Sequence, residues 1–218
     1  MATIGVIGSG HIGATLAKQL IAAGNTVIMS NNHGPESLSG LIKELGPNAK
    51  AGTPAEAGKQ PIVVLAVLRP GVADVVAQTP DWTDKIIIDA TNELGPDTYT
   101  DPAYPGSELV AHLAPNAHVI KAFNTLFARY MTGQTAAGKR VLFYGGDDAD
   151  SKQTAATLFE KMGYAPVDLG TLKEAGPMME FGAPLSGTHF IQPDESVLHL
   201  YGNDLVSLGP FYFSLCPM

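Results

Sequence analysis

The sequence predicts an α/β fold with a doubly wound, mainly parallel sheet and a small C-terminal extension. Short β-branched runs alternate with longer segments of helical period from the first residues to about residue 170. Runs such as Ile62–Leu68 and Ile86–Ile88 also lack polar alternation. Because helices cover parallel strands on both faces, such continuous apolar runs are typical of the centre of a parallel sheet.

The predicted elements follow one another along the chain. We expect strands at Thr3–Ile7, Thr26–Met29, Pro61–Leu68, Lys85–Ala90, His118–Ala122, Arg140–Tyr144 and Ala165–Leu169. We expect helices at His11–Ala23, Ser37–Leu45 and Ala149–Met162. Asp148 or Asp150 would cap the third helix, and Gly24 and Gly163 stand where the first and third helices should end. After about Leu172 the periodic spacing of apolar residues weakens, and we expect irregular or helical segments that pack on the rest of the fold.

The first strand is followed by a glycine-rich turn. The residues Gly8-Ser9-Gly10-His11-Ile12-Gly13 match the pattern G-x-G-x-x-G and open the first predicted helix. Gly8 would permit the tight turn, Gly10 would let a pyrophosphate approach the backbone, and Gly13 would let the helix pack on the strand. The amides at the helix N-terminus would then bind the phosphates. In this position the pattern predicts a Rossmann-type dinucleotide site; the alternative is a turn that only connects strand to helix.

The end of the second strand indicates which dinucleotide binds. NAD-binding proteins usually carry Asp or Glu about 20 residues after the glycines, to hold the ribose 2′-hydroxyl. This sequence has Ser30-Asn31-Asn32-His33 instead. Because this stretch has no carboxylate to repel a 2′-phosphate, its side chains could donate hydrogen bonds to that group. We therefore favour NADP(H) over NAD(H); the alternative is that these residues only form the turn before Gly34-Pro35.

Composition limits the classes of function. The chain has 218 residues and a formal net charge of -8, so it would repel nucleic acid and anionic membrane surfaces. Its single cysteine, Cys216, cannot form an internal disulfide. No apolar run approaches the ~20 residues of a membrane span, and the run Ile4-Gly5-Val6-Ile7-Gly8, which no basic residue precedes, is too short for the apolar part of a signal peptide. We expect a soluble, cytoplasmic protein that binds neither nucleic acid nor membrane.

The sequence lacks the common motifs for proton transfer and metal binding. No Tyr is followed by Lys four residues later, and Ser186 does not stand in a G-x-S-x-G motif. The six histidines lack metal-ligand spacing, so we expect no metal. Asp89 would more simply cap a turn than act on a substrate, and Lys121 could be a general acid or form a structural ion pair. We assign no catalytic residue, which suits hydride transfer between two stacked redox rings.

Several further segments resemble one known family. They are Ser30-Asn31-Asn32-His33-Gly34-Pro35-Glu36-Ser37, Ile88-Asp89-Ala90-Thr91-Asn92, Val119-Ile120-Lys121-Ala122-Phe123-Asn124-Thr125, Gly145-Gly146-Asp147-Asp148 and Pro166-Val167-Asp168-Leu169-Gly170. With these segments and the glycine turn, the chain resembles the coenzyme F420-dependent NADP oxidoreductases, in which NADP(H) exchanges a hydride with a deazaflavin. The NADPH-binding domain of the membrane metalloreductases is a related group. The resemblance runs from Gly5 to about Leu185.

The resemblance implies which residues bind the cofactor. The glycine turn would bind the pyrophosphate, the end of the second strand would surround the 2′-phosphate, and Phe123-Asn124-Thr125 would line the nicotinamide. Relatives usually carry an arginine at the 2′-phosphate, and this sequence has none there. The full predicted set is Gly8, Ser9, Gly10, His11, Ile12, Gly13, Ser30, Asn31, Asn32, His33, Ala66, Val67, Leu68, Ala90, Thr91, Phe123, Asn124 and Thr125. For its apolar members the alternative is a place in the core.

The predicted function is therefore that of an NADP(H)-dependent oxidoreductase. It would transfer a hydride between nicotinamide and a deazaflavin (F420) or flavin-type acceptor, with FMN, FAD, a quinone or a small imine open as the second ligand. The alternatives are an NADPH-dependent reductase of a small imine or carbonyl substrate and a non-catalytic NADP(H)-binding sensor. Residues 1–170 would form the NADP(H)-binding Rossmann domain. Residues 171–218 would form a C-terminal extension that packs on the sheet or on a dimer surface, and the family resemblance implies a homodimer.

Overall fold

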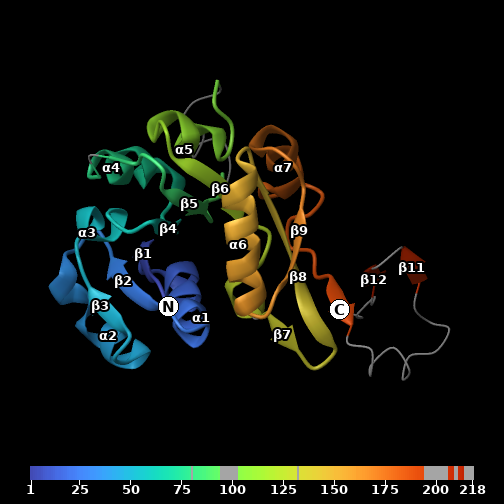
Figure 1. Ribbon diagram of the computed structural model, residues 1–218, viewed down its shortest axis with the longest axis horizontal. Coiled ribbons are helices and arrows are strands. Elements are labelled where there is room, and N and C mark those ends of the chain that lie inside the picture. The colour runs from blue at the N-terminus through green and yellow to red at the C-terminus, as the bar shows by residue number, and fades with distance from the viewer. Residues whose placement is uncertain (80, 94–102, 132, 194–205, 209–210, 214–218) are drawn as a thin grey trace.

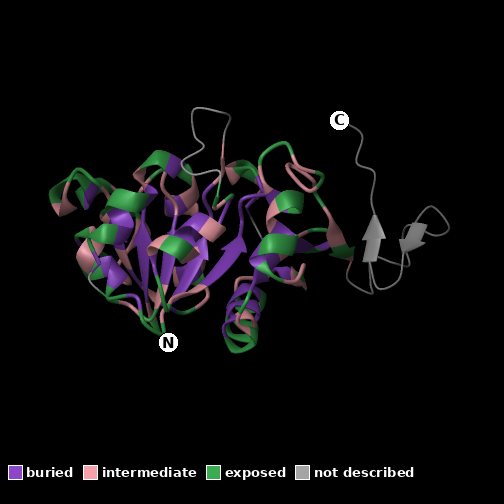
Figure 2. Ribbon diagram, turned by 90° about the horizontal axis from the view of Figure 1, so that it is seen from above, coloured by how far each residue is buried: buried purple, intermediate pink, exposed green. Residues whose placement is uncertain are grey.

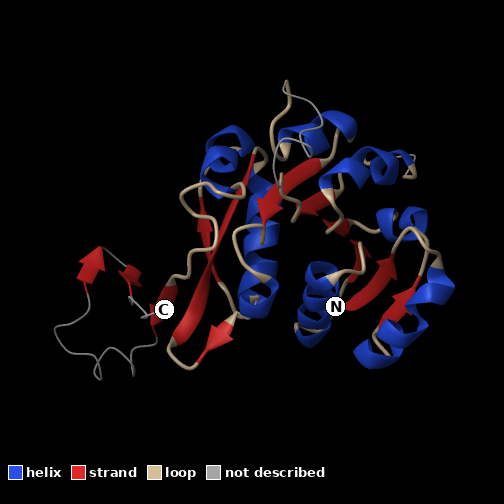
Figure 3. Cartoon of the chain, turned by 180° about the vertical axis from the view of Figure 1, so that it is seen from behind, coloured by secondary structure: helices blue, strands red, loops and turns tan. Residues whose placement is uncertain are grey.

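The computed structural model describes residues 1–79, 81–93, 103–131 and 133–193, and the backbone of 206–208 and 211–213 (Figure 1). Much of the C-terminal extension predicted from the sequence, including Cys216, lies outside the described residues. The described part forms an α/β fold in which helices flank a central sheet (Figure 3).

The sheet has the strand order of a Rossmann-type fold. Its strands are β1 (Thr3–Ile7), β2 (Thr26–Ser30), β3 (Ala49–Ala51), β4 (Ile62–Leu65), β5 (Ile86–Asp89), β6 (His118–Ala122), β7 (Gln134–Thr135), β8 (Gly138–Gly146), β9 (Ala165–Asp168), β10 (Ile191–Pro193), β11 (Val206–Leu208) and β12 (Phe211–Phe213). Strands β1 to β6 run parallel in the order β3-β2-β1-β4-β5-β6. Strand β8 joins β6 in the antiparallel direction and pairs in parallel with β9. The prediction of a mainly parallel, doubly wound sheet is confirmed.

The observed helices agree with the predicted ones where apolar residues recur with a clear helical period. They are α1 (His11–Ala22), α2 (Ser39–Leu45), α3 (Pro54–Gly58), α4 (Val72–Ala77), α5 (Glu108–Leu113), α6 (Ala149–Lys161) and α7 (Leu172–Met179), with short 3-10 helices η1 (Pro35–Leu38), η2 (Arg69–Gly71) and η4 (Ala128–Tyr130). Asp148 caps α6 by accepting a hydrogen bond from the Ser151 amide at 2.8 Å. The helix predicted to begin at Ser37 instead starts as η1, because Gly34 has a φ of 87° and Pro35 sets the tighter first turn.

Two apolar clusters lie on opposite faces of the sheet, since side chains alternate along each strand. Val6 of β1 packs with Leu16 of α1 and Phe159 of α6 in one cluster. Its neighbour Ile7 belongs to the other cluster, which includes Val75 of α4 and residues of α3 and α5. Figure 2 shows the buried residues concentrated in the strands, with exposed residues on the outer sides of the helices. This arrangement leaves the carboxyl edge of the parallel strands for loops.

The segment after residue 170 joins the same sheet. Thr171 and Glu174 form a capping box that starts α7, and α7 packs against β6 and β8. Strand β10 pairs with β8 in the antiparallel direction, with Ile191 opposite Arg140. The loop between α7 and β10 therefore returns across the sheet edge near the end of β6.

The aromatic contacts between α6 and the sheet yield a stability prediction. Phe159 is fully buried, and its ring centroid lies 5.1 Å from that of Phe123 and 5.8 Å from that of Tyr144. We expect Phe159→Ala to lower the free energy of unfolding by about 3–5 kcal/mol, because it leaves a cavity in the core. Phe181→Ala is the control, because Phe181 is 57% exposed. Equal urea midpoints for the two variants would contradict this packing.

Candidate dinucleotide-binding site

The turn between β1 and α1 leaves no room for side chains at two glycines. Gly8 has a φ of 113°, a conformation that favours glycine, and its amide donates to the Ser30 carbonyl at 2.9 Å. A Cβ added at Gly8 would lie 2.1 Å from the Ala66 carbonyl oxygen. A Cβ added at Gly13 would lie 1.9 Å from the Gly8 carbonyl oxygen. The start of α1 is therefore held against the turn by direct backbone packing.

Gly10 opens α1 toward the solvent. It is the N-cap residue, and its carbonyl oxygen accepts the first helical bond from the Ala14 amide at 2.9 Å. No side chain of the described residues caps this helix. A Cβ built on Gly10 would meet no described atom within 4 Å, so a ligand can approach the backbone. Free first-turn amides and the positive end of the helix dipole suit a phosphate group here.

A pocket of about 840 Å³ extends from this turn along the carboxyl ends of the strands. It brings together most of the residues that the sequence predicts for the cofactor. These are Gly8, Ser9, Gly10, His11, Ile12, Asn31, Asn32, His33, Ala66, Val67, Leu68, Ala90, Thr91, Asn124 and Thr125. The pocket lies where β1 and β4 meet and the strand order reverses, which is the usual ligand position in an open α/β sheet.

Three predicted residues do not line the pocket. Gly13 lies behind the turn, where it allows α1 to pack. Ser30 is buried, and its hydroxyl lies 3.4 Å from the Val6 carbonyl oxygen instead of facing a ligand. Phe123 is 1% exposed, has a φ of 67°, and packs edge-on against Tyr164. Neither Ser30 nor Phe123 lines the pocket, and their contact with the cofactor stays a prediction.

The loop after β2 is ordered by the Asn31 side chain. Its Nδ2 donates to the hydroxyl oxygens of Ser9 at 3.2 Å and Ser37 at 2.9 Å, and its Oδ1 accepts from the His33 amide at 2.9 Å. Asn32, His33 and Ser37 are exposed. Asn31 thus connects the glycine turn to a loop whose polar side chains point outward, as the binding of a ribose phosphate beside the turn requires.

The pocket also includes residues that the sequence reasoning missed. They include Pro54 of α3, Asp74 and Val75 of α4, and Gln78 directly after α4. Both helices have six residues or fewer, so they give little periodic signal from which their inner faces could be predicted. They extend the cavity beyond the loop after β2 and give it a partly apolar wall there.

Three of the residues that line the pocket are exposed apolar side chains, which we call its apolar mouth. They are Leu68, Phe127 and Phe181, which are 74%, 50% and 57% exposed. The loop after α7 is attached here, because the Gly187 amide donates to the Thr125 carbonyl oxygen at 2.8 Å. Only Leu68 of these was predicted as a site residue. The two phenylalanines come from segments far apart in the sequence, so no local pattern could have paired them.

Asn124 lines the same end and keeps one unpaired acceptor. Its Nδ2 donates to Asn92 Oδ1 at 3.1 Å and to the Met179 carbonyl oxygen at 2.8 Å. Its Oδ1 is buried and has no hydrogen-bond partner among the described residues. An unpaired buried acceptor costs about 1–3 kcal/mol of stability.

The charged groups near this end are paired behind the pocket wall. Asp89 accepts hydrogen bonds from the Thr91 amide at 3.0 Å and the Ser107 hydroxyl at 2.6 Å, so it caps the turn as expected. Lys121 is fully buried, and its ammonium group forms an ion pair with Glu180. The structural interpretation of Lys121 is therefore the one that its surroundings favour. Both groups stabilise the wall instead of facing the cavity.

Arg69 forms a second buried interaction behind the wall. Its guanidinium group donates to the Thr91 hydroxyl at 3.3 Å and to the Gly106 carbonyl oxygen, and it lies 3.5 Å from the Glu93 carboxylate. Glu93 in turn accepts from the Gly106 amide at 3.3 Å. These bonds tie the loop after β4 to the loop after β5, so both walls of this end are held together.

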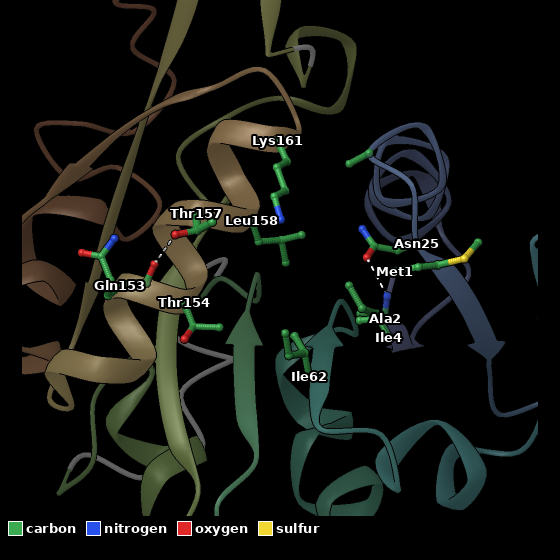
Figure 4. Close-up of a pocket in the computed structure, with 11 residues that line it drawn as sticks. Met1, Ala2, Ile4, Asn25, Ile62, Gln153, Thr154, Thr157, Leu158 and Lys161 are labelled. Atoms are coloured by element: carbon green, nitrogen blue, oxygen red, sulfur yellow. Dashed lines mark hydrogen bonds between the residues drawn. The ribbon is translucent and has the colours of Figure 1, made fainter.

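A second, smaller cavity of about 370 Å³ lies at the other edge of the sheet (Figure 4). It is bordered by Met1 and Ile4 near the start of β1, by Ile62 at the start of β4, and by Thr157 and Lys161 of α6. It therefore lies at the amino ends of the strands, away from the glycine turn. Parallel α/β sheets bind ligands at the carboxyl ends, so the larger pocket is the candidate site.

Neither a metal-binding cluster nor a membrane-spanning helix occurs among the described residues. They include no group of three or more His, Cys, Asp or Glu side chains placed to hold a metal ion. Within the same residues, no helix has the length and apolar character needed to span a membrane.

We expect different effects from alanine substitutions at Gly10 and Gly13. Gly10→Ala should fold normally, since the added methyl meets nothing, but it should weaken NADPH binding by about tenfold or more where the pyrophosphate would approach. Gly13→Ala should lower both the melting temperature and NADPH affinity, because its methyl overlaps the Gly8 carbonyl. Gly40→Ala, also free of contacts but on α2, is the control. Calorimetric titration with NADPH and thermal melts check all three; unchanged binding by Gly10→Ala would refute the assignment of the turn.

Comparisons with known proteins agree with this geometry. The family model described as NADP oxidoreductase, coenzyme F420-dependent, matches residues 3–93. A hypothetical protein, SMa0349, from Sinorhizobium meliloti is 38% identical, with a TM-score of 0.80 over 88% of this chain and 96% of that one. A candidate F420-dependent NADP reductase from Arthrobacter sp. FB24 is 24% identical, with a TM-score of 0.66 over 79% of this chain and 86% of that one.

A curated relative matches over the same region. Metalloreductase STEAP3 from Rattus norvegicus is 27% identical over 173 residues, which are 79% of this chain and 34% of the relative. The chain therefore spans about a third of the length of the curated relatives it matches. Together with the Rossmann-type fold and the glycine turn, the family match places residues 3–93 in the coenzyme F420-dependent NADP oxidoreductase family.

Proposed function

We propose that this protein binds NADP(H) in the large pocket and exchanges a hydride between nicotinamide and a planar deazaflavin or flavin acceptor. Membership of an NADP-dependent oxidoreductase family supports the cofactor. The main support for the proposal is that one pocket includes both the glycine turn and the exposed apolar mouth. Such a pocket suits a phosphate-bearing nucleotide and an apolar ring in succession.

The polar part of the pocket supports NADP(H). The open backbone at Gly10 would bind the pyrophosphate, and the exposed side chains of Asn32 and His33 would donate to the 2′-phosphate. No carboxylate lines the pocket in the loop after β2 among the described residues. The adenine would lie against Pro54 and the residues of α4 that extend the cavity.

The other end supports a hydride transfer that relies on position. The unpaired Asn124 Oδ1 could accept a hydrogen bond from the nicotinamide carboxamide. Bound NADPH would supply the hydride, and reduction of the acceptor ring also takes up one proton. Because Lys121 is buried in its ion pair with Glu180, we assign that proton to water at the open mouth. Orientation of the two rings would then provide most of the catalysis.

Reduction of a small carbonyl or imine finds less support. Such a reaction benefits from a protein group that donates a proton at the reacting atom. Of the described residues that line the mouth, Leu68, Phe127 and Phe181 are apolar and Thr125 and Ser186 are neutral hydroxyls. The broad apolar surface fits a ring system better than a small polar substrate.

Stopped-flow mixing of the protein with NADPH and F420, FMN, FAD or a quinone tests the proposal. We expect rapid oxidation of NADPH, followed at its absorbance band, with one of the planar acceptors. Gly10→Ala, which should bind NADPH more weakly, should lower the rate of NADPH oxidation when NADPH is limiting. Binding of NADPH without turnover on any acceptor would instead favour the nucleotide sensor, and turnover only with a small imine would favour that reductase.

The choice between NADP and NAD depends on the exposed loop after β2. We expect His33→Asp to shift the ratio of NADH to NADPH affinity toward NADH by about tenfold, since a carboxylate there would repel the 2′-phosphate and could hold a 2′-hydroxyl. His33→Gln keeps a neutral polar side chain and serves as the control. Calorimetric titration with both nucleotides gives the ratio. An affinity ratio that His33→Asp leaves unchanged would show that the 2′-phosphate binds elsewhere.

A further inference from the structure

We propose that Arg129 forms an anion-binding subsite at the mouth of the pocket, where it recognises a phosphate or carboxylate carried by the second substrate. The inference rests on the proposed function and adds a chemical property of the acceptor to it. It assigns the acceptor to the anionic planar redox cofactors, as opposed to neutral rings such as riboflavin or a simple quinone.

The position of Arg129 follows from its neighbours. It lies in η4, two residues after Phe127, and it is exposed. The central carbon of its guanidinium group lies 5.6 Å from the Phe127 ring centroid and 4.7 Å from the Tyr130 ring centroid. Stacking on aromatic rings is a common way to hold an arginine in one place. The charge therefore stands beside the apolar wall that would contact the acceptor ring.

The surroundings of Arg129 are positively charged, although the whole chain is acidic. Arg140 lies 5.9 Å from the same Tyr130 ring, and its guanidinium group lies 3.3 Å from Nδ1 of His189. Burial lowers the pKa of His189, and the positive charges of Arg140 and Arg129 lower it further. Among the described residues no carboxylate forms an ion pair with Arg129. With a formal net charge of -8 over the chain, this is a local exception.

Bound NADP(H) would not contact the positive charge of Arg129. Its phosphates would lie at the glycine turn and the loop after β2, whereas Arg129 follows the apolar mouth at the β6 end. A ring that packs on Phe127 and Phe181 would carry its side chain out through the mouth. A phosphate on that side chain would meet the planar fork of Arg129, which suits phosphate and carboxylate oxygens. FMN has such a phosphate, and F420 has a phosphate followed by carboxylates.

Paired probes that differ in charge test the subsite by binding. The dissociation constants of FMN and riboflavin would be measured from flavin fluorescence on the NADP⁺-loaded protein, and those of F420 and its neutral tail-less chromophore in the same way. Because the arginine is exposed, we expect the anionic member of at least one pair to bind about fivefold more tightly at low salt. The preference should shrink at high salt, where exposed charges are screened.

Variants separate the charge of Arg129 from its packing. Arg129→Ala should remove the preference for the anionic probe and leave the dissociation constant of the neutral probe within about twofold. Arg129→Lys should keep part of the preference, because it retains the charge but loses the fork. Lys43→Ala, which removes a cation from α2 far along the chain from the mouth, should leave the preference unchanged.

The outcomes distinguish this inference from the proposed function. A wild-type preference that Arg129→Ala leaves intact would overturn the subsite, as would equal binding of both members of each pair or no measurable binding of any probe. None of these readings depends on turnover. If the anionic probes bind through Arg129 but NADPH transfers no hydride to them, the subsite stands and the proposed reaction fails.

Discussion

The backbone contact between the first turn of α1 and the end of β1 determines where the candidate site lies. The Gly13 backbone is so close to the Gly8 carbonyl oxygen that a Cβ would stand 1.9 Å from it, and Gly8 approaches the loop after β4 as closely. Only hydrogen atoms fit at these positions. As a result, the helix N-terminus remains at the carboxyl edge of the sheet, with its first amides directed toward the pocket. A larger residue at either glycine would move the helix before any ligand could bind.

The rest of the pocket is organised around this turn. On one side, Asn31 connects the turn to an exposed polar loop. On the other, Arg69 and Lys121 are held in buried ion pairs, which tie the loop after β4 to the loop after β5 and β6 to the segment after α7. Burying such pairs adds little stability compared with apolar packing, and removing one partner is costly. Their effect here is to fix the wall against which an open, apolar mouth can hold a second ring.

Most of the fold could be predicted from the sequence because it depends on local patterns. Strand β6 was predicted at its observed bounds from the alternation of strand-like and helix-like segments, and α6 was predicted from its period with Asp148 or Asp150 as its cap. Non-local geometry is what the sequence patterns do not reveal. Phe123 follows β6 as a site residue would, but it has a positive φ and its ring packs in the core. Phe127 and Phe181 line the same pocket, and the Gly187–Thr125 hydrogen bond attaches the loop after α7 to the segment after β6; no sequence pattern encodes that attachment.

The position of the nucleotide can be determined in a crystal structure of the protein grown with NADPH. We expect density for the dinucleotide along the large pocket, with the pyrophosphate within hydrogen-bonding distance of the amides at the start of α1 and the nicotinamide beside Asn124. Density that lies elsewhere, or a pocket that stays empty while calorimetry of the same sample with NADPH and NADH gives no heat, would contradict the assignment of a nucleotide site to the glycine turn.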